Sequence, residues 1–147
     1  MGNNQDDMLR DRATVAGWYQ AAMAELDGVT PMYDGPQERS WFVYAPRLDA
    51  DIDRNAVIGA LDAQGIAAKP YLPCIHLQPF YRERFGFVEG DFPAAEAASR
   101  STLALPFHAN LETEAIEIIQ RRLSNEEWHE LEAVSYTHLT LPTKRIV

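Results

Sequence analysis

Cysteine is nearly absent from this 147-residue sequence, which holds only Cys74. A single thiol cannot close an internal disulfide, and no cluster of Cys and His has the spacing of metal ligands. Cys74 stands beside a proline without a recognisable base, so we interpret it as small apolar filler rather than a nucleophile. These absences exclude a disulfide scaffold and a zinc module, and they favour a reducing, cytoplasmic location.

Positive charge is also scarce. Thirteen Lys and Arg stand against 22 Asp and Glu, for a formal net charge of −9. A nucleic acid or an anionic membrane surface needs a basic face, which these scattered cations hardly supply. No apolar run is long enough to cross a bilayer, and the N-terminal "MGNNQDDMLR" is too polar for a signal peptide. We therefore expect neither a nucleic acid nor a membrane as partner.

The familiar catalytic motifs are missing as well. The sequence has no GxSxG elbow, no Gly-rich phosphate loop and no HExxH helix. It holds two lysines, Lys69 and Lys144. A Schiff base on Lys69 is chemically conceivable because a desolvated lysine becomes nucleophilic. Nothing around Lys69 supplies the partners that a cofactor ring needs, so the sequence shows no catalysis that this chain would perform alone.

What is present indicates one globular domain, with 46% hydrophobic and 24% charged residues. Apolar periodicity and capping residues predict helices, and β-branched or aromatic runs predict strands. The expected order is helix 8–26, strand 40–48, helix 54–64 capped by Asp53 and closed by Gly65, strand 66–72, a loop, a helix capped by Asp91, strand 103–106 and helix 111–123. This order favours an α/β (α+β) fold: a small mixed or antiparallel three-stranded sheet packed with about four helices.

Residues 69–87, "KPYLPCIHLQPFYRERFGF", form the most unusual stretch because proline and aromatic residues crowd around a histidine. A polar side chain in a proline-stiffened loop is held in place, as a binding site requires. His76 could donate to a phosphate or hydroxyl oxygen, or it could bond a neighbouring backbone group and pack the loop. The hydroxyl of Tyr71 could likewise face a ligand, or it could simply form a hydrogen bond at the end of a strand.

Cations flank the same stretch. Lys69, Arg82 and Arg84 could form a rim that binds an anion, or they could simply be solvated, as charged residues beside an aromatic loop often are. The C-terminal "SYTHLTLPTKRIV", residues 135–147, changes abruptly to Thr- and Leu-rich sequence with a basic end. It resembles translated sequencing-adaptor read-through, and we exclude it from fold reasoning as a non-native tail, with a native β-prone tail as the alternative.

Six short blocks of sequence within residues 9–123 resemble, in their order, the sequence of a known protein family. The blocks are "RATVAGWY", "SWFVYAPRL", "DIDRNAVIGALDAQGI", "HLQPFYRE", "DFPAAEA" and "LALPFHANL". Their order and gaps resemble the C-terminal small domain of the DegT/DnrJ/StrS family of pyridoxal-phosphate-dependent aminotransferases, enzymes of fold type I that aminate keto sugars carried on nucleotides. Two positions depart from the family pattern: Tyr71 stands where many members have histidine, which leaves the sugar unassigned, and Cys74 stands where proline is common.

The resemblance implies a division of labour. Residues 1–134 would be a small domain that closes the cleft over a nucleotide-linked keto sugar, with Tyr71, His76 and Lys69 contacting substrate. Pyridoxal phosphate, its Schiff-base lysine and the site for the amino-acid donor would belong to a large domain with no counterpart here, and the parent would be a homodimer. The chain alone would then hold no cofactor and be inactive.

Two other readings stay open. The chain could be a free-standing, non-catalytic α/β module that binds a ligand or partner, or an enzyme that works from Lys69 alone.

Overall fold

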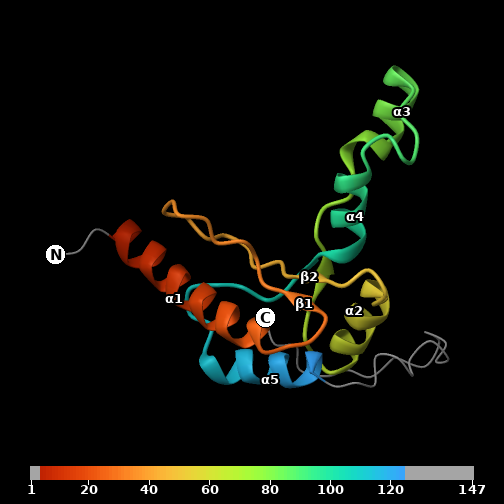
Figure 1. The fold of residues 1–147 in the computed structure, drawn as a ribbon. Helices are drawn as coiled ribbons and strands as arrows, with labels where there is room; N and C mark the ends of the chain where they lie inside the picture. The colour runs from red at the N-terminus through yellow and green to blue at the C-terminus, as the bar shows by residue number, and fades with distance from the viewer. Residues whose placement is uncertain (1–3, 125–147) are drawn as a thin grey trace.

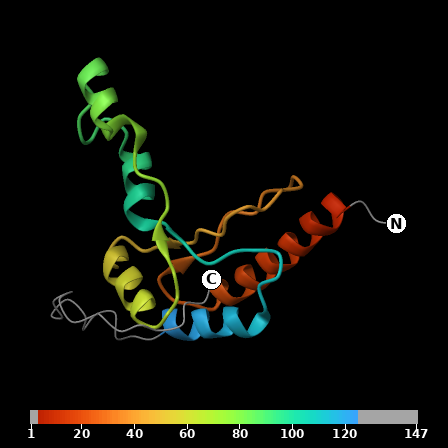
Figure 2. The ribbon, with the colours of Figure 1, turned by 180° about the vertical axis from the view of Figure 1, so that it is seen from behind.

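The structure, a computed structural model, describes residues 4–124 as a mixed α/β body with a projecting arm (Figure 1). The helices are α1 (Asn4–Ala24), α2 (Arg54–Ala63), α3 (Pro79–Phe85), α4 (Pro93–Ser101) and α5 (Thr113–Leu123), with the 3-10 turn η1 (Ile75–Leu77) before α3. The strands are β1 (Val29–Thr30), β2 (Arg47–Leu48), β3 (Lys69–Pro70) and β4 (Leu103–Ala104). Helices α1, α2 and α5 lie in the body, while η1, α3 and α4 form the arm, residues 72–101 (Figures 1 and 2). The predicted α/β class is confirmed.

The strands form two antiparallel ladders, β1 with β2 and β3 with β4. Two isolated bridges, Tyr44 with Leu105 and Arg47 with Thr102, join the ladders edge to edge. The three-stranded sheet expected from the sequence is not confirmed, because residues 4–124 contain two short ladders joined by bridges.

The predicted strand over residues 40–48 shrinks to β2. Pro46 has no N–H to donate to a ladder, and the N–H of Ala45 donates to the sulfur of Met32 at 2.9 Å instead. Likewise, the strand expected over residues 66–72 keeps only β3, since the N–H of Ala68 turns back to the carbonyl of Ile66 at 3.1 Å.

The segment expected to be a loop between β3 and α4 contains helix α3, so that expectation was wrong. Pro79 begins α3, where its missing N–H is not needed, and Gly86 ends it with a left-handed φ of 72°. Asp91 does not cap α4 as predicted. Its carboxylate accepts the N–H of Val88 at 2.9 Å, which leaves Phe92 at the N-cap.

Helix α2 begins and ends where the sequence predicts. The carboxylate of Asp53 accepts the N–H groups of Asn55 at 3.0 Å and Ala56 at 3.2 Å. Beyond the other end, Gly65 has a φ of 82°, a conformation that costs a residue with a Cβ extra energy. Both signals confirm the capping interpretation.

Replacing Asp53 by alanine is expected to lower the free energy of unfolding by about 0.5–2 kcal/mol, because two N–H groups of the first turn lose their acceptor. Urea denaturation of the 147-residue chain followed by circular dichroism measures the change. Asp51→Ala is the matched control, since it removes the same charge from an exposed neighbour that does not cap the helix. Equal losses in the two variants would contradict the capping role.

The core lies between α1, α2, α5 and the two ladders. Its fully buried large side chains include Val15, Tyr19, Met23, Tyr44, Val57, Leu61, Ile66, Leu103 and Ile119. Helix α1 begins earlier than the predicted residue 8, and Met8 is 42% exposed rather than part of the buried stripe. None of the helices within residues 4–124 combines the length and the apolar character that crossing a membrane requires.

Candidate functional site

Two of the three predicted contact residues lie at β3: Lys69 within the strand and Tyr71 directly after it. Lys69 lies exposed and Tyr71, two residues further along the chain, is half-buried. The backbone of Tyr71 is fixed to Thr102, whose carbonyl accepts its N–H at 3.4 Å and whose hydroxyl donates to its carbonyl at 3.4 Å. The structure therefore brings Lys69 and Tyr71 together at the root of the arm.

Leu72 redirects the chain from β3 into the arm. Its φ of 53° lies in the left-handed region, which is rare for a residue with a branched side chain. The hydroxyl of Ser99 in α4 donates to the carbonyl of Leu72 at 3.1 Å and stabilises the turn. Such backbone strain persists where the surrounding structure enforces it, often at functional sites.

His76 lies beyond this turn, in η1, with only 8% of its surface exposed. The edge of its ring meets Phe92 with centroids 4.8 Å apart, and Phe87 lies 6.3 Å away. Its Nε2 faces the carboxylate of Glu96 in α4, 3.6 Å from Oε1. The structure thus packs His76 into the arm, apart from Lys69 and Tyr71.

The arm exposes an unusual amount of apolar surface. Its exposed large apolar side chains are Leu72, Ile75, Phe80, Tyr81, Phe85, Val88 and Phe92. Ile75 is 68% exposed and Phe80 63%, although both are among the residues that proteins most readily bury. Arg82 and Arg84 lie exposed among them on α3, which stands at the far end of the arm from the body (Figures 1 and 2), so they do not converge with Lys69 of β3 into one anion-binding rim. Large exposed apolar patches mark surfaces that bind another protein surface, a membrane or a ligand.

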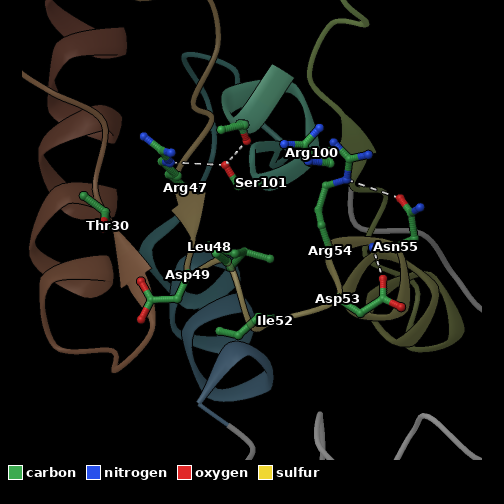
Figure 3. Close-up of a pocket in the computed structure, with 12 residues that line it drawn as sticks. Thr30, Arg47, Leu48, Asp49, Ile52, Asp53, Arg54, Asn55, Arg100 and Ser101 are labelled. Atoms are coloured by element: carbon green, nitrogen blue, oxygen red, sulfur yellow. Dashed lines mark hydrogen bonds between the residues drawn. The ribbon is translucent and has the colours of Figure 1, made fainter. Parts of the chain in front are cut away.

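A second candidate site is a cavity of about 600 Å³ between β2, the start of α2 and the end of α4 (Figure 3). Three arginines line it: Arg47, Arg54 and Arg100. Arg47 donates to the hydroxyl of Ser101 at 3.2 Å. Arg54 donates to the carbonyls of Ser99 and Thr102, the latter at 3.1 Å, and so caps the end of α4.

Sequence reasoning missed this cavity because its arginines come from segments far apart in the chain. The side chain of Arg100 forms no hydrogen bond or ion pair with any residue that the structure describes. The carboxylate of Asp53 is committed to capping α2, and that of Asp49 points away from Arg54 and Arg100 (Figure 3). Guanidinium groups in this arrangement can bind a phosphate or a carboxylate. Within residues 4–124, no group of three or more His, Cys, Asp and Glu is placed to hold a metal ion.

The chain is similar in sequence to proteins of known or assigned role. The chain is 31% identical over 117 residues to the spore coat polysaccharide biosynthesis protein SpsC of Bacillus subtilis, covering 76% of this chain and 30% of that protein. It is 36% identical over 114 residues to the GDP-perosamine synthase of Caulobacter vibrioides, covering 75% of this chain and 30% of the synthase.

A solved structure agrees with the fold. The crystal structure of S. venezuelae DesV in complex with a ketimine intermediate superimposes with a TM-score of 0.72 at 26% identity, over 88% of this chain and 33% of that one. The chain thus spans about a third of the length of these relatives. The model of the DegT/DnrJ/EryC1/StrS aminotransferase family matches residues 3–124, and the chain belongs to this family.

Proposed function

We propose that residues 1–134 are the cleft-closing small domain of a longer pyridoxal-phosphate-dependent aminotransferase that aminates a nucleotide-linked keto sugar. Family membership and the perosamine synthase relative support the reaction class. The limited share of each relative that the chain covers supports the assignment to one domain. Residues 135–147, proposed to be a non-native tail, lie outside the described residues.

The observation that carries this proposal is the apolar arm. Seven large apolar side chains between Leu72 and Phe92 are exposed, on a segment that projects from the body (Figures 1 and 2). Exposure of this much apolar surface is unfavourable by about 25 cal/mol for each Å² left in water. A large domain packed against the arm would bury this surface and make the arm one wall of an active-site cleft.

The lysine within residues 4–124 does not fit the cofactor. A lysine that forms a Schiff base is made nucleophilic by a desolvating pocket or a neighbouring cation, whereas Lys69 lies exposed on a two-residue strand. We therefore assign the lysine, the partner of the pyridine nitrogen and the phosphate-binding residues to the absent large domain. The chain alone is expected to hold no cofactor and to be inactive.

Within the longer enzyme, Lys69, Tyr71 and His76 would contact the sugar nucleotide. Their positions support a role in binding and orientation: Lys69 in β3 and Tyr71 directly after it are two residues apart, and the ring of His76 packs against Phe92 in the arm. Orientation alone can supply a large part of a rate enhancement. A homodimer would complete the site, and an amino-acid donor would supply the nitrogen.

A chimera tests the proposal. Residues 4–124 replace the matching C-terminal segment of the Caulobacter vibrioides GDP-perosamine synthase, to which the chain is 36% identical. We expect the chimera to transfer an amino group to the keto-sugar nucleotide, because the large domain supplies the chemistry and this chain closes the cleft. Product formation followed by chromatography measures the transfer.

The controls are the truncated synthase without a small domain and the 147-residue chain alone with pyridoxal phosphate and borohydride. Both are expected to be silent, and the chain is expected to form no reducible adduct. A soluble chimera that binds the cofactor but is no more active than the truncated synthase would overturn the proposal. An adduct on Lys69 would instead favour an enzyme that works from this chain alone.

The arginine cavity favours a second candidate, a free-standing module that binds an anionic ligand. The side chain of Arg100 forms no hydrogen bond or ion pair within residues 4–124, and the exposed Arg47 lines the same cavity. A module of this kind would be monodisperse and would unfold cooperatively, whereas a domain that lacks its partner would associate through the arm. Sedimentation velocity of the 147-residue chain separates these two behaviours.

A further inference from the structure

Two buried polar side chains, one from η1 and one from α4, face each other inside the arm. His76 is 8% exposed and Glu96 4%, and Nε2 of His76 lies 3.6 Å from Oε1 of Glu96. That separation is too long for a hydrogen bond but within the range of an ion pair. Buried polar groups are normally paired, so this contact needs a physical account.

Glu96 is short of donors. The N–H of Gly90 reaches both carboxylate oxygens, at 2.8 Å and 3.1 Å. A carboxylate offers about four lone-pair positions, and one shared N–H leaves most of them unfilled. The loop before α4 thus fixes the carboxylate in place while leaving it ready to accept a further donor.

His76 is short of an acceptor on the same side. Its Nε2 is buried and has no hydrogen-bond partner among the residues that the structure describes. Contacts with Phe92 and Phe87 hold the ring in place. A bare Nε2 would point its lone pair at a carboxylate, which is repulsive, whereas a protonated Nε2 gives both groups a complementary partner.

We propose that Glu96 is a positioning residue that holds His76 in the tautomer with the proton on Nε2. A carboxylate that receives one ring nitrogen decides which nitrogen carries the proton and fixes the orientation of the ring. Neutral His76 then presents Nδ1 as an acceptor. This last step rests on the proposed function: in the aminotransferase, Nδ1 accepts a hydrogen bond from a substrate hydroxyl and does not donate to a phosphate.

Long-range ¹H–¹⁵N spectra of the 147-residue chain test this directly, because they distinguish a protonated from a bare ring nitrogen. His76→Gln identifies the signals of His76 among the four histidines. In the wild-type chain, with the ring of His76 neutral, we expect a protonated Nε2 and a bare Nδ1. The opposite tautomer would overturn the proposal. The measurement is made on the wild-type chain, so the only variant that has to fold is His76→Gln, which is used for assignment.

Glu96→Gln then asks whether the carboxylate is the cause. Removing the charge should raise the fraction of the Nδ1-protonated form, while the control Glu89→Gln, an exposed neighbour on the same arm, leaves the spectrum unchanged. A folded Glu96→Gln chain with a wild-type spectrum would also overturn the proposal. These spectra are recorded without substrate, so the two proposals can fail independently. An inactive chimera would not affect the conclusion that Glu96 sets the tautomer of His76, and the opposite tautomer would not affect the proposed aminotransferase reaction.

Discussion

Replacing Tyr19 by alanine is expected to lower the free energy of unfolding by about 3–5 kcal/mol, a large share of the roughly 5–15 kcal/mol that holds a typical domain together. Tyr19 has no exposed surface and stacks on Tyr44 with ring centroids 4.6 Å apart and planes 10° apart. Its hydroxyl donates to the carbonyl of Pro106 at 2.6 Å. The substitution therefore leaves a cavity between α1 and the ladders and strips a buried carbonyl of its donor.

Urea denaturation of the 147-residue chain measures this loss, with two controls that separate its causes. Tyr19→Phe keeps the ring and removes the hydroxyl, so it should lose only about 1–3 kcal/mol through the unpaired carbonyl of Pro106. Trp18→Ala removes a similarly large aromatic side chain from the adjacent position, which is 38% exposed, and should lose about 1 kcal/mol or less. Equal losses at positions 18 and 19 would show that α1 does not pack as described.

The parts of the fold that local chemistry determines were predictable. Asp53 and Gly65 mark the two ends of α2 because a capping carboxylate and a left-handed glycine act on residues next to them in the chain. Strand lengths were not predictable in the same way. Pairing in the ladders depends on distant partners such as Tyr44 with Leu105, and the sequence around Tyr44 contains no sign of that partner.

The candidate site was likewise predictable only where the signal lies in neighbouring residues. Residues 69–87 stood out as crowded with proline and aromatic residues, and that region became the arm. The contact of His76 with Glu96 joins residues 20 positions apart through two short helices and a turn, so no periodic pattern indicates it. Arg47, Arg54 and Arg100 meet only after α4 folds onto the start of α2, and the cavity is therefore a product of tertiary structure.

The stability of the chain is expected to fall as the pH rises from about 10 to 12, with the stacked tyrosines as the cause. Burial raises the pKa of Tyr44 from its usual value of 10 to about 12. Burial raises the pKa of Tyr19 further, and the nearby Tyr44 adds to this. The folded state therefore keeps protons on these phenols that the unfolded chain releases above pH 10.

The sign follows from linkage: where the folded state binds more protons than the unfolded state, the free energy of unfolding decreases with rising pH. Below pH 10 both states are protonated and the contribution of these tyrosines is constant. Urea midpoints measured between pH 9 and pH 12 should thus be level at first and then decline. The sequence holds two lysines and six tyrosines, so phenols dominate the titration in this window.

Tyr44→Phe should flatten this decline, because one of the two buried phenols is gone while the ring stack with Tyr19 remains. It should also lower stability at neutral pH, since the hydroxyl of Tyr44 donates to the side-chain oxygen of Gln20 on α1. Tyr33→Phe removes a hydroxyl from a side chain that is 79% exposed, leaves the stack intact and should decline as the wild type does. A decline in Tyr44→Phe as steep as that in Tyr33→Phe would mean that Tyr44 does not contribute to it. A flatter decline in Tyr44→Phe alone would tie the stability of the body to the contact between α1 and the segment that precedes β2.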